Sequence, residues 1–162
     1  MTSHQGIAGL LSIVLLLAAC AGTPTQQAKA TDFRKQLESA DLALREARLN
    51  DAEIQYRQLA QSHPQLPDIW LNLGNIYSRQ SQLEAAMRAY KQGLRYAGDD
   101  GRLWYNLSLV ELKQSMLTLE TASELLPANS PYLVNIQQLH RALLSSTRAG
   151  DSSDPPSPGS AP

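Results

Sequence analysis

Several features that define common functional classes are scarce in this chain of 162 residues. It has one cysteine, Cys20, which excludes an intramolecular disulfide and a zinc site built from cysteines. The formal net charge is −1, so we expect neither a nucleic-acid footprint nor a polybasic membrane-binding patch. The apolar stretch over residues 7–19 is too short to span a hydrocarbon core, which requires about 20 helical residues.

Catalytic motifs are also missing from the sequence. The three histidines, His4, His63 and His140, are scattered, and no HExxH, GxSxG or phosphate-binding glycine-rich motif occurs. The acidic residues at 99–100 and within 151–154 lack EF-hand spacing, and a turn and a solvated tail explain them more simply. We therefore expect no enzyme activity, no cofactor and no metal site.

What is present begins with an N-terminus typical of an export signal. Residues 1–19 contain no Lys, Arg, Asp or Glu, and small residues follow their apolar stretch. The sequence LAAC at 17–20 resembles the lipobox of bacterial lipoproteins, which implies a signal peptide over 1–19 and palmitate or similar acyl chains on Cys20. With alanine at position 21, the resemblance also implies the periplasmic face of a Gram-negative outer membrane. An uncleaved helical anchor and an ordinary core segment are the alternatives.

Two further segments differ in composition from the middle of the chain. Residues 20–31 are mostly small and polar, which predicts a flexible tether after the lipidated cysteine, reaching at most about 35–40 Å. Residues 149–162 have no large apolar side chain to bury, so we expect a disordered tail. The folded domain is expected over residues 32–148.

Within that domain the sequence repeats itself every 34 residues. Trp70 and Trp104 have this spacing, as do Tyr56 and Tyr90, and the pattern resembles a tetratricopeptide repeat. The resemblance implies an all-α fold, a short α-solenoid of antiparallel helix hairpins in which both tryptophans are buried. The positions that carry the repeat are Ala40, Ala52, Tyr56, Trp70, Leu73, Gly74, Tyr77, Ala86, Tyr90, Trp104, Leu107 and Ser108.

The repeats differ in completeness. We expect units over about 33–66 and 67–100, a shortened unit over 101–129, and a C-terminal capping helix over 131–147. In the third unit the usual alanine and tyrosine positions fall on Glu120 and Glu124. The sequence predicts a tight turn there near Gln114–Ser115 and a short second helix over 116–126; a continuous helix is the alternative.

The resemblance also implies a concave groove, lined by the first helix of each repeat, that holds a peptide or a partner helix. The positions carried over are Leu37, Asp41, Leu44, Asn72, Asn75, Arg79, Arg102, Tyr105, Asn106, Leu109, Val134 and Asn135. Asn72 and Arg102 fit the pattern with which some of these domains clamp a terminal carboxylate. Leu37 and Asp41 replace the expected Lys and Asn, and Asp41 would repel a carboxylate, which argues against a complete clamp.

Small lipoproteins with such repeats are non-catalytic adaptors, and this implies a membrane-anchored scaffold for protein–protein interaction. The function expected first is assembly of an envelope machine such as a type IV or Flp (Tad) pilus or a secretin. The alternative is an adaptor that recruits or regulates peptidoglycan enzymes, and an enzyme is the third and least favoured alternative. The expected partner is a peptide segment or helix of an envelope protein. The small number of repeats is compatible with a homodimer that completes the solenoid.

Overall fold

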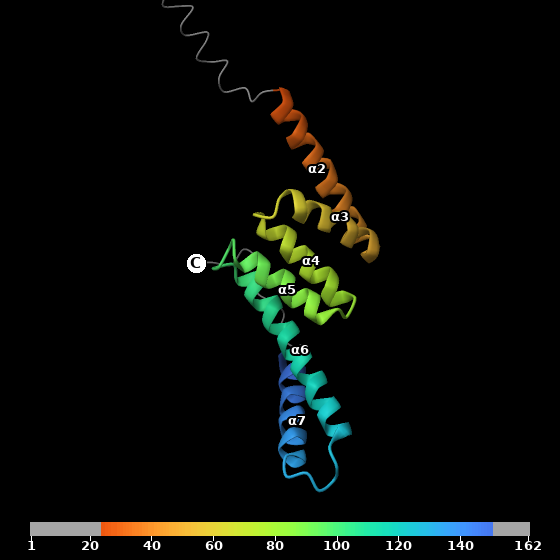
Figure 1. Cartoon of the computed structure of the whole chain (residues 1–162), viewed down its shortest axis with the longest axis vertical. Coiled ribbons are helices and arrows are strands. Elements are labelled where there is room, and N and C mark those ends of the chain that lie inside the picture. The colour runs from red at the N-terminus through yellow and green to blue at the C-terminus, as the bar shows by residue number, and fades with distance from the viewer. Residues whose placement is uncertain (1–23, 151–162) are drawn as a thin grey trace, which may run out of the picture. The chain divides into compact units, whose positions relative to one another are not determined.

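The computed structural model describes residues 24–150, all of whose regular structure is helical (Figure 1). This confirms the expected all-α class. The predictions for the signal peptide, for Cys20 and for residues 151–162 lie outside the described residues. The helices are α2 (Pro24–Arg45), α3 (Leu49–Ser62), α4 (Pro67–Arg79), α5 (Leu83–Leu94), α6 (Gly101–Leu125) and α7 (Leu133–Gly150). Over this range, every helix is too short or too polar to cross a membrane.

The chain divides into two units, one ending at Pro64 and one beginning at Gln65, and each is described by itself. In the first unit α2 and α3 form a hairpin. Ala40, Ala43 and Ala52 are fully buried and allow the two helices to approach closely, while Tyr56 fills the remaining space. The open end of the hairpin is closed by the Phe33 ring, which packs on the ring of His63 with centroids 4.3 Å apart.

Helix α2 corrects the expected tether. It begins at Pro24, so residues 24–31 are helical and only residues 20–23 of the expected linker lie outside the described helix. The physical reason is local, because proline fits the first turn of a helix and Gln, Ala and Lys are strong helix formers. The hydroxyl of Thr31 donates to the carbonyl of Gln27 at 2.8 Å, one turn earlier.

The second unit begins with the α4–α5 hairpin, whose helices meet at a glycine. Gly74 is buried in the middle of α4, and a Cβ atom added there would overlap the ring of Tyr90. Tyr90 is 1% exposed and packs in a cluster with Leu71, Ala86 and Leu103. The small residue therefore admits the aromatic ring, as the pattern of small and aromatic positions predicts.

The turns of the two hairpins have the same geometry, 34 residues apart. Ala47 and Ser81 both adopt left-handed backbone conformations, with φ of 56° and 59°. The backbone N–H of Arg48 donates to the carbonyl of Ala43 at 2.9 Å, and that of Gln82 donates to Tyr77 at 2.8 Å, closing each helix in the same way. The period read from the sequence is thus a structural period over both complete hairpins.

Helix α6 corrects the expected third hairpin. It runs without interruption from Gly101 to Leu125, so the predicted turn at Gln114–Ser115 and the separate helix over 116–126 are wrong, and the continuous helix is correct. At the predicted turn, the hydroxyl of Ser115 donates to the carbonyl of Glu111 at 2.8 Å within the helix.

The two glutamates explain why the chain does not turn back. Glu120 and Glu124 occupy the positions of Ala86 and Tyr90, the residues that hold α5 against α4. A helix folded back in the same register would place two carboxylates where the preceding hairpin buries a methyl group and an aromatic ring. Burial of unpaired charges costs several kcal/mol, roughly, for each ion, which disfavours that fold.

The missing hairpin leaves repeat positions of α6 uncovered. Trp104 is 51% exposed, whereas the sequence predicted a buried residue, and its Nε1–H donates to the carbonyl of Gly98 at 2.8 Å. Ser108 is also exposed, and its hydroxyl donates to the carbonyl of Trp104. Only the face of α6 that packs on the preceding hairpin, with Leu103 and Leu107, is buried.

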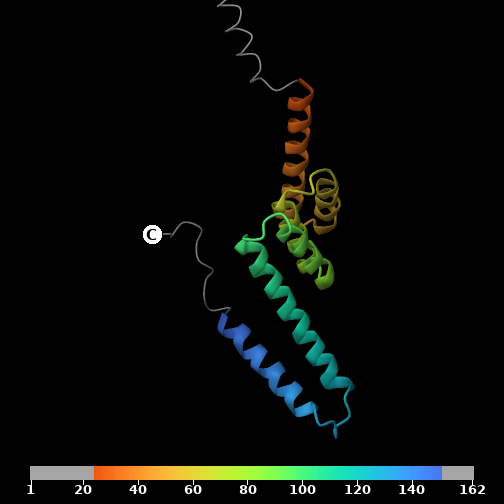
Figure 2. The same ribbon diagram turned by 60° about the vertical axis from the view of Figure 1, so that its left-hand side comes forward.

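Helix α7 lies beside the C-terminal half of α6 and runs back along it (Figure 2). Its bounds, Leu133–Gly150, agree with the predicted helix over 131–147 to within three residues. The partly buried residues of α7 recur at helical spacing, at Leu133, Ile136, His140 and Leu143, and form the side that faces α6.

Candidate interaction surface

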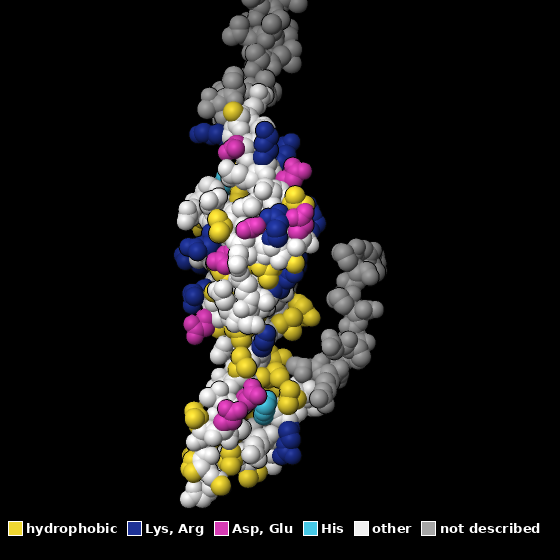
Figure 3. Space-filling view, turned by 90° about the vertical axis from the view of Figure 1, so that its right-hand side faces the viewer, with side chains coloured by type: hydrophobic (Ala, Val, Ile, Leu, Met, Phe, Trp, Pro, Cys, Tyr) yellow, Lys and Arg dark blue, Asp and Glu magenta, His cyan; other side chains and the backbone are white. Residues whose placement is uncertain are grey.

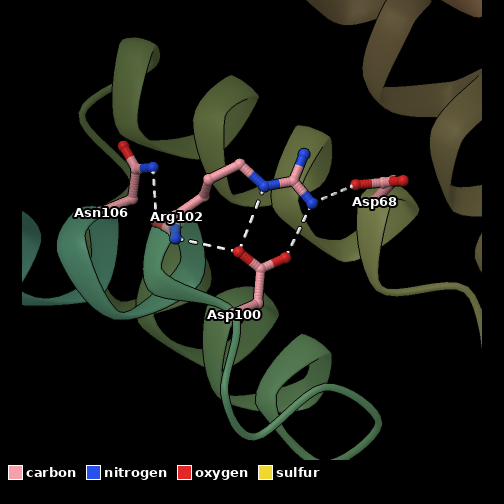
Figure 4. A network of polar contacts seen from close by, with 4 residues as sticks. All are labelled: Asp68, Asp100, Arg102 and Asn106. Carbon is pink, nitrogen blue, oxygen red and sulfur yellow. Dashed lines mark hydrogen bonds and ion pairs between the residues drawn. The ribbon is translucent and has the colours of Figure 1, made fainter. Parts of the chain in front are cut away.

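The N-terminal turns of α4 and α6 are joined by an ion pair between residues 34 apart. The Arg102 Nη2 lies 2.7 Å from the Asp68 Oδ1 and 2.7 Å from the Asp100 Oδ2 (Figure 4). Asp68 and Arg102 hold the same position in successive repeats, so their contact aligns α4 with α6 in register at this end. The corresponding residues further along, Asn72 and Asn106, are therefore expected to be neighbours.

Arg102 is already occupied by carboxylates of the chain itself. Its Nε–H donates to the Asp100 Oδ1 at 3.1 Å, and its backbone N–H donates to the same oxygen at 2.9 Å, so that Asp100 caps α6. These hydrogen bonds hold the pKa of the Asp100 carboxyl below its usual range and, together with Asp68, raise the pKa of the guanidinium. A peptide carboxylate would have to displace both aspartates, so this arrangement disfavours the carboxylate clamp.

Two further groove positions also have partners inside the chain. The Tyr90 hydroxyl donates to the Asn75 Oδ1 at 2.8 Å, and the Tyr56 hydroxyl donates to Asp41 in the first unit. The two hydrogen bonds are equivalent, since both members of each are 34 residues apart. Asp41 and Asn75 therefore fix the tyrosines that fill the hairpins, and only the amide N–H groups of Asn75 remain to bind a ligand.

Burial raises the pKa of Tyr90 to about 12, above its ordinary value near 10. The unfolded chain loses this proton at lower pH than the folded chain, so stability is complete below about pH 10 and falls between pH 10 and 12. We expect urea unfolding, followed by circular dichroism, to show a steeper loss of stability over this interval for the wild type than for Tyr90→Phe. Parallel curves for the two proteins would contradict the burial of this hydroxyl.

Exposed apolar side chains gather on the first half of α6. Tyr105 is 61% exposed and Leu109 is 46% exposed, in addition to Trp104. The equivalent of Tyr105 in the previous repeat, Leu71, is only 9% exposed. Beside these residues the amide of Asn106 donates to the carbonyl of Arg102 at 2.8 Å, which leaves its own Oδ1 as an acceptor. The combination of aromatic, aliphatic and amide groups suits a peptide segment.

The remaining groove positions do not all belong to one site. Leu37 and Leu44 are half-buried residues of α2, in the first unit, and Arg79 is exposed at the end of α4. Val134 and Asn135 are exposed at the start of α7, beyond the C-terminal end of α6. The 20 residues of α6 from Tyr105 to Leu125 span about 30 Å at 1.5 Å per residue. The expected continuation of the groove onto the last helix is therefore wrong.

The exposure of Trp104 and of the second half of α6 was missed from the sequence. The signal was present at Glu120 and Glu124, which are incompatible with the interior of a third hairpin. Over the described residues no three His, Cys, Asp or Glu side chains are grouped to hold a metal ion. A shallow, open depression of about 380 Å³ lies between the start of α5, at Leu83 and Ala85, and Leu117 of α6; it lacks the enclosure of a small-molecule site.

No protein-family model matches the chain, and a comparison with curated proteins gives no significant match. The function of the protein is therefore inferred from the geometry of the described residues and from the motifs in its sequence.

Proposed function

We propose that this protein is a tetratricopeptide-type adaptor that docks a segment of an envelope protein on the surface formed by α4 and α6. The observation that carries this proposal is the exposed set of Trp104, Tyr105 and Leu109, at positions where a solenoid with a complete third repeat would continue. Aromatic side chains of this kind contribute most of the affinity in protein interfaces. The adjoining amides of Asn75 and Asn106 offer a donor and an acceptor to an extended backbone.

The membrane part of the proposal comes from the lipobox-like sequence that ends at Cys20. Lipid on this cysteine holds the folded units close to the periplasmic face of the outer membrane. The partner class favoured is a pilus or secretin component, since the chain carries exposed apolar residues on α6 and its sequence has no catalytic motif. Recovery of a peptidoglycan hydrolase or synthase instead would favour the murein-linked adaptor.

Affinity capture from a detergent extract of the native cell envelope tests the docking surface. We expect the wild-type chain to enrich a pilus or secretin component, and the double variant Asn72→Ala/Tyr105→Ala to recover about tenfold less. Tyr96→Ala is the matched control, because Tyr96 is 47% exposed and lies outside α4 and α6. Equal loss with Tyr96→Ala, or recovery of no envelope-machine protein, contradicts the proposal. A Cys20→Ser chain is expected to leave the membrane fraction.

A further inference from the structure

The hairpin of α6 and α7 leaves its apolar residues incompletely covered. No residue from Glu111 to Ser146 is buried. Leu125 is 78% exposed, Val134 59% and Leu139 52%. Figure 3 shows hydrophobic side chains gathered over this part of the molecule. Two helices without a further layer expose the flanks of their common seam, and stable helical proteins cover such flanks with additional helices.

One apolar stripe of α6 continues past the helices that cover it. Leu103, Leu107 and Val110 lie at helical spacing and are at most 3% exposed, because α4 and α5 pack over them. The same face continues to Leu117, which is 44% exposed and borders the shallow depression at the start of α5, and to Leu125. The uncovered half of the stripe is thus continuous with the core.

The two helices of the hairpin carry opposite charges. From Gln114 to its end α6 has Glu120 and Glu124 and no basic residue, whereas α7 has Arg141 and no acidic residue. Within the described residues the two glutamates form no ion pair, and the Arg141 Nε–H donates only to the carbonyl of Gln137, at 3.2 Å. The acidic and basic helices are therefore not neutralised by each other in a single copy.

We propose that the α6–α7 hairpin binds the same hairpin of a second copy of this chain and forms an antiparallel four-helix bundle. A two-fold axis sets α6 of each copy against α7 of the other, so that an acidic helix faces a basic helix twice. Both helices are long enough, since the 12 residues of α6 from Gln114 to Leu125 span about 18 Å and α7 spans about 27 Å. A second copy supplies the required charges and the apolar seam together. This dimer does not depend on the proposed adaptor function.

The mass of the chain in solution tests the dimer. Residues 20–162 with Cys20→Ser keep every described residue and exclude pairs linked by lipid or by a disulfide. Light scattering after size exclusion is expected to give the mass of two chains at micromolar concentration, and sedimentation then gives the dissociation constant. A wild-type monomer at every concentration overturns the proposal, and a monomer that instead floats with lipid vesicles overturns it in favour of a membrane surface.

Substitutions in the seam locate the interface. Leu117→Glu with Leu125→Glu is expected to raise the dissociation constant at least tenfold, and Arg141→Glu is expected to raise it by a smaller factor. The side chains replaced are exposed in one copy, so the helical circular dichroism should not change. Ile54→Glu is the matched control, because Ile54 is 58% exposed and lies on α3. A dimer that survives the double substitution, or that the Ile54 variant weakens equally, overturns the proposal. The assay contains no partner protein, so its failure is separate from failure of the adaptor function.

Discussion

Tyr90→Ala is expected to lower the free energy of unfolding by about 3–5 kcal/mol, the usual cost of deleting a buried aromatic side chain. Tyr90 is 1% exposed, its ring lies against Gly74, and its hydroxyl donates to Asn75. The substitution leaves a cavity between α4 and α5 and removes the hydrogen bond that fixes Asn75. Urea or thermal unfolding followed by circular dichroism measures the loss.

Trp104→Ala is the comparison that makes this result informative. Trp104 is larger but 51% exposed, so its replacement is expected to cost less than about 1 kcal/mol. The sequence alone predicts the opposite, because a third hairpin would bury this residue as fully as any core tryptophan. Equal destabilisation by the two substitutions would mean that α6 turns back at Gln114–Ser115, contrary to the structure.

Gly74→Ala is expected to destabilise the protein by about 1–3 kcal/mol, even though alanine favours a helix by about 1 kcal/mol over glycine. The added methyl group would overlap the Tyr90 ring, and that ring can move only by giving up its packing and its hydrogen bond. The measurement is the same unfolding experiment.

Two controls separate crowding from backbone effects. Gly101 lies at the start of α6 with nothing within 4 Å of an added Cβ, so Gly101→Ala is expected to be neutral or to stabilise by up to about 1 kcal/mol. In a Tyr90→Ala background the ring is gone, and Gly74→Ala should then cost little or nothing. Additive costs for Gly74→Ala and Tyr90→Ala would rule out the proposed clash.

The hairpins were predictable because the residues that form them are close in sequence. Gly74 and Tyr90 lie within one hairpin, as do Ala40 and Tyr56, so a small residue and an aromatic ring at fixed spacing define the contact that joins two neighbouring helices. The same applies to the left-handed turns at Ala47 and Ser81, which recur with the period of the sequence. Local pattern and tertiary packing agree in these segments.

The candidate site was predictable only in part. Tyr105 and Leu109 are exposed beside the amides, as the pattern of groove positions indicates. Arg102 and Asn75, by contrast, are engaged by Asp68, Asp100 and Tyr90. A sequence position shows that a polar residue faces a groove, but its partners depend on which side chains the fold brings within hydrogen-bond distance.

The sequence by itself determined the all-α class, the two complete hairpins and the 34-residue period that relates them. Only the tertiary structure decided the course of the chain after Gln114, where helix propensity is compatible with either a turn or a straight helix. The deciding factor is the environment that Glu120 and Glu124 would enter, because a folded-back helix buries both carboxylates and a straight helix leaves them in water. That choice exposes Trp104 and the apolar flank of α6, and with them the surfaces through which this protein is proposed to act.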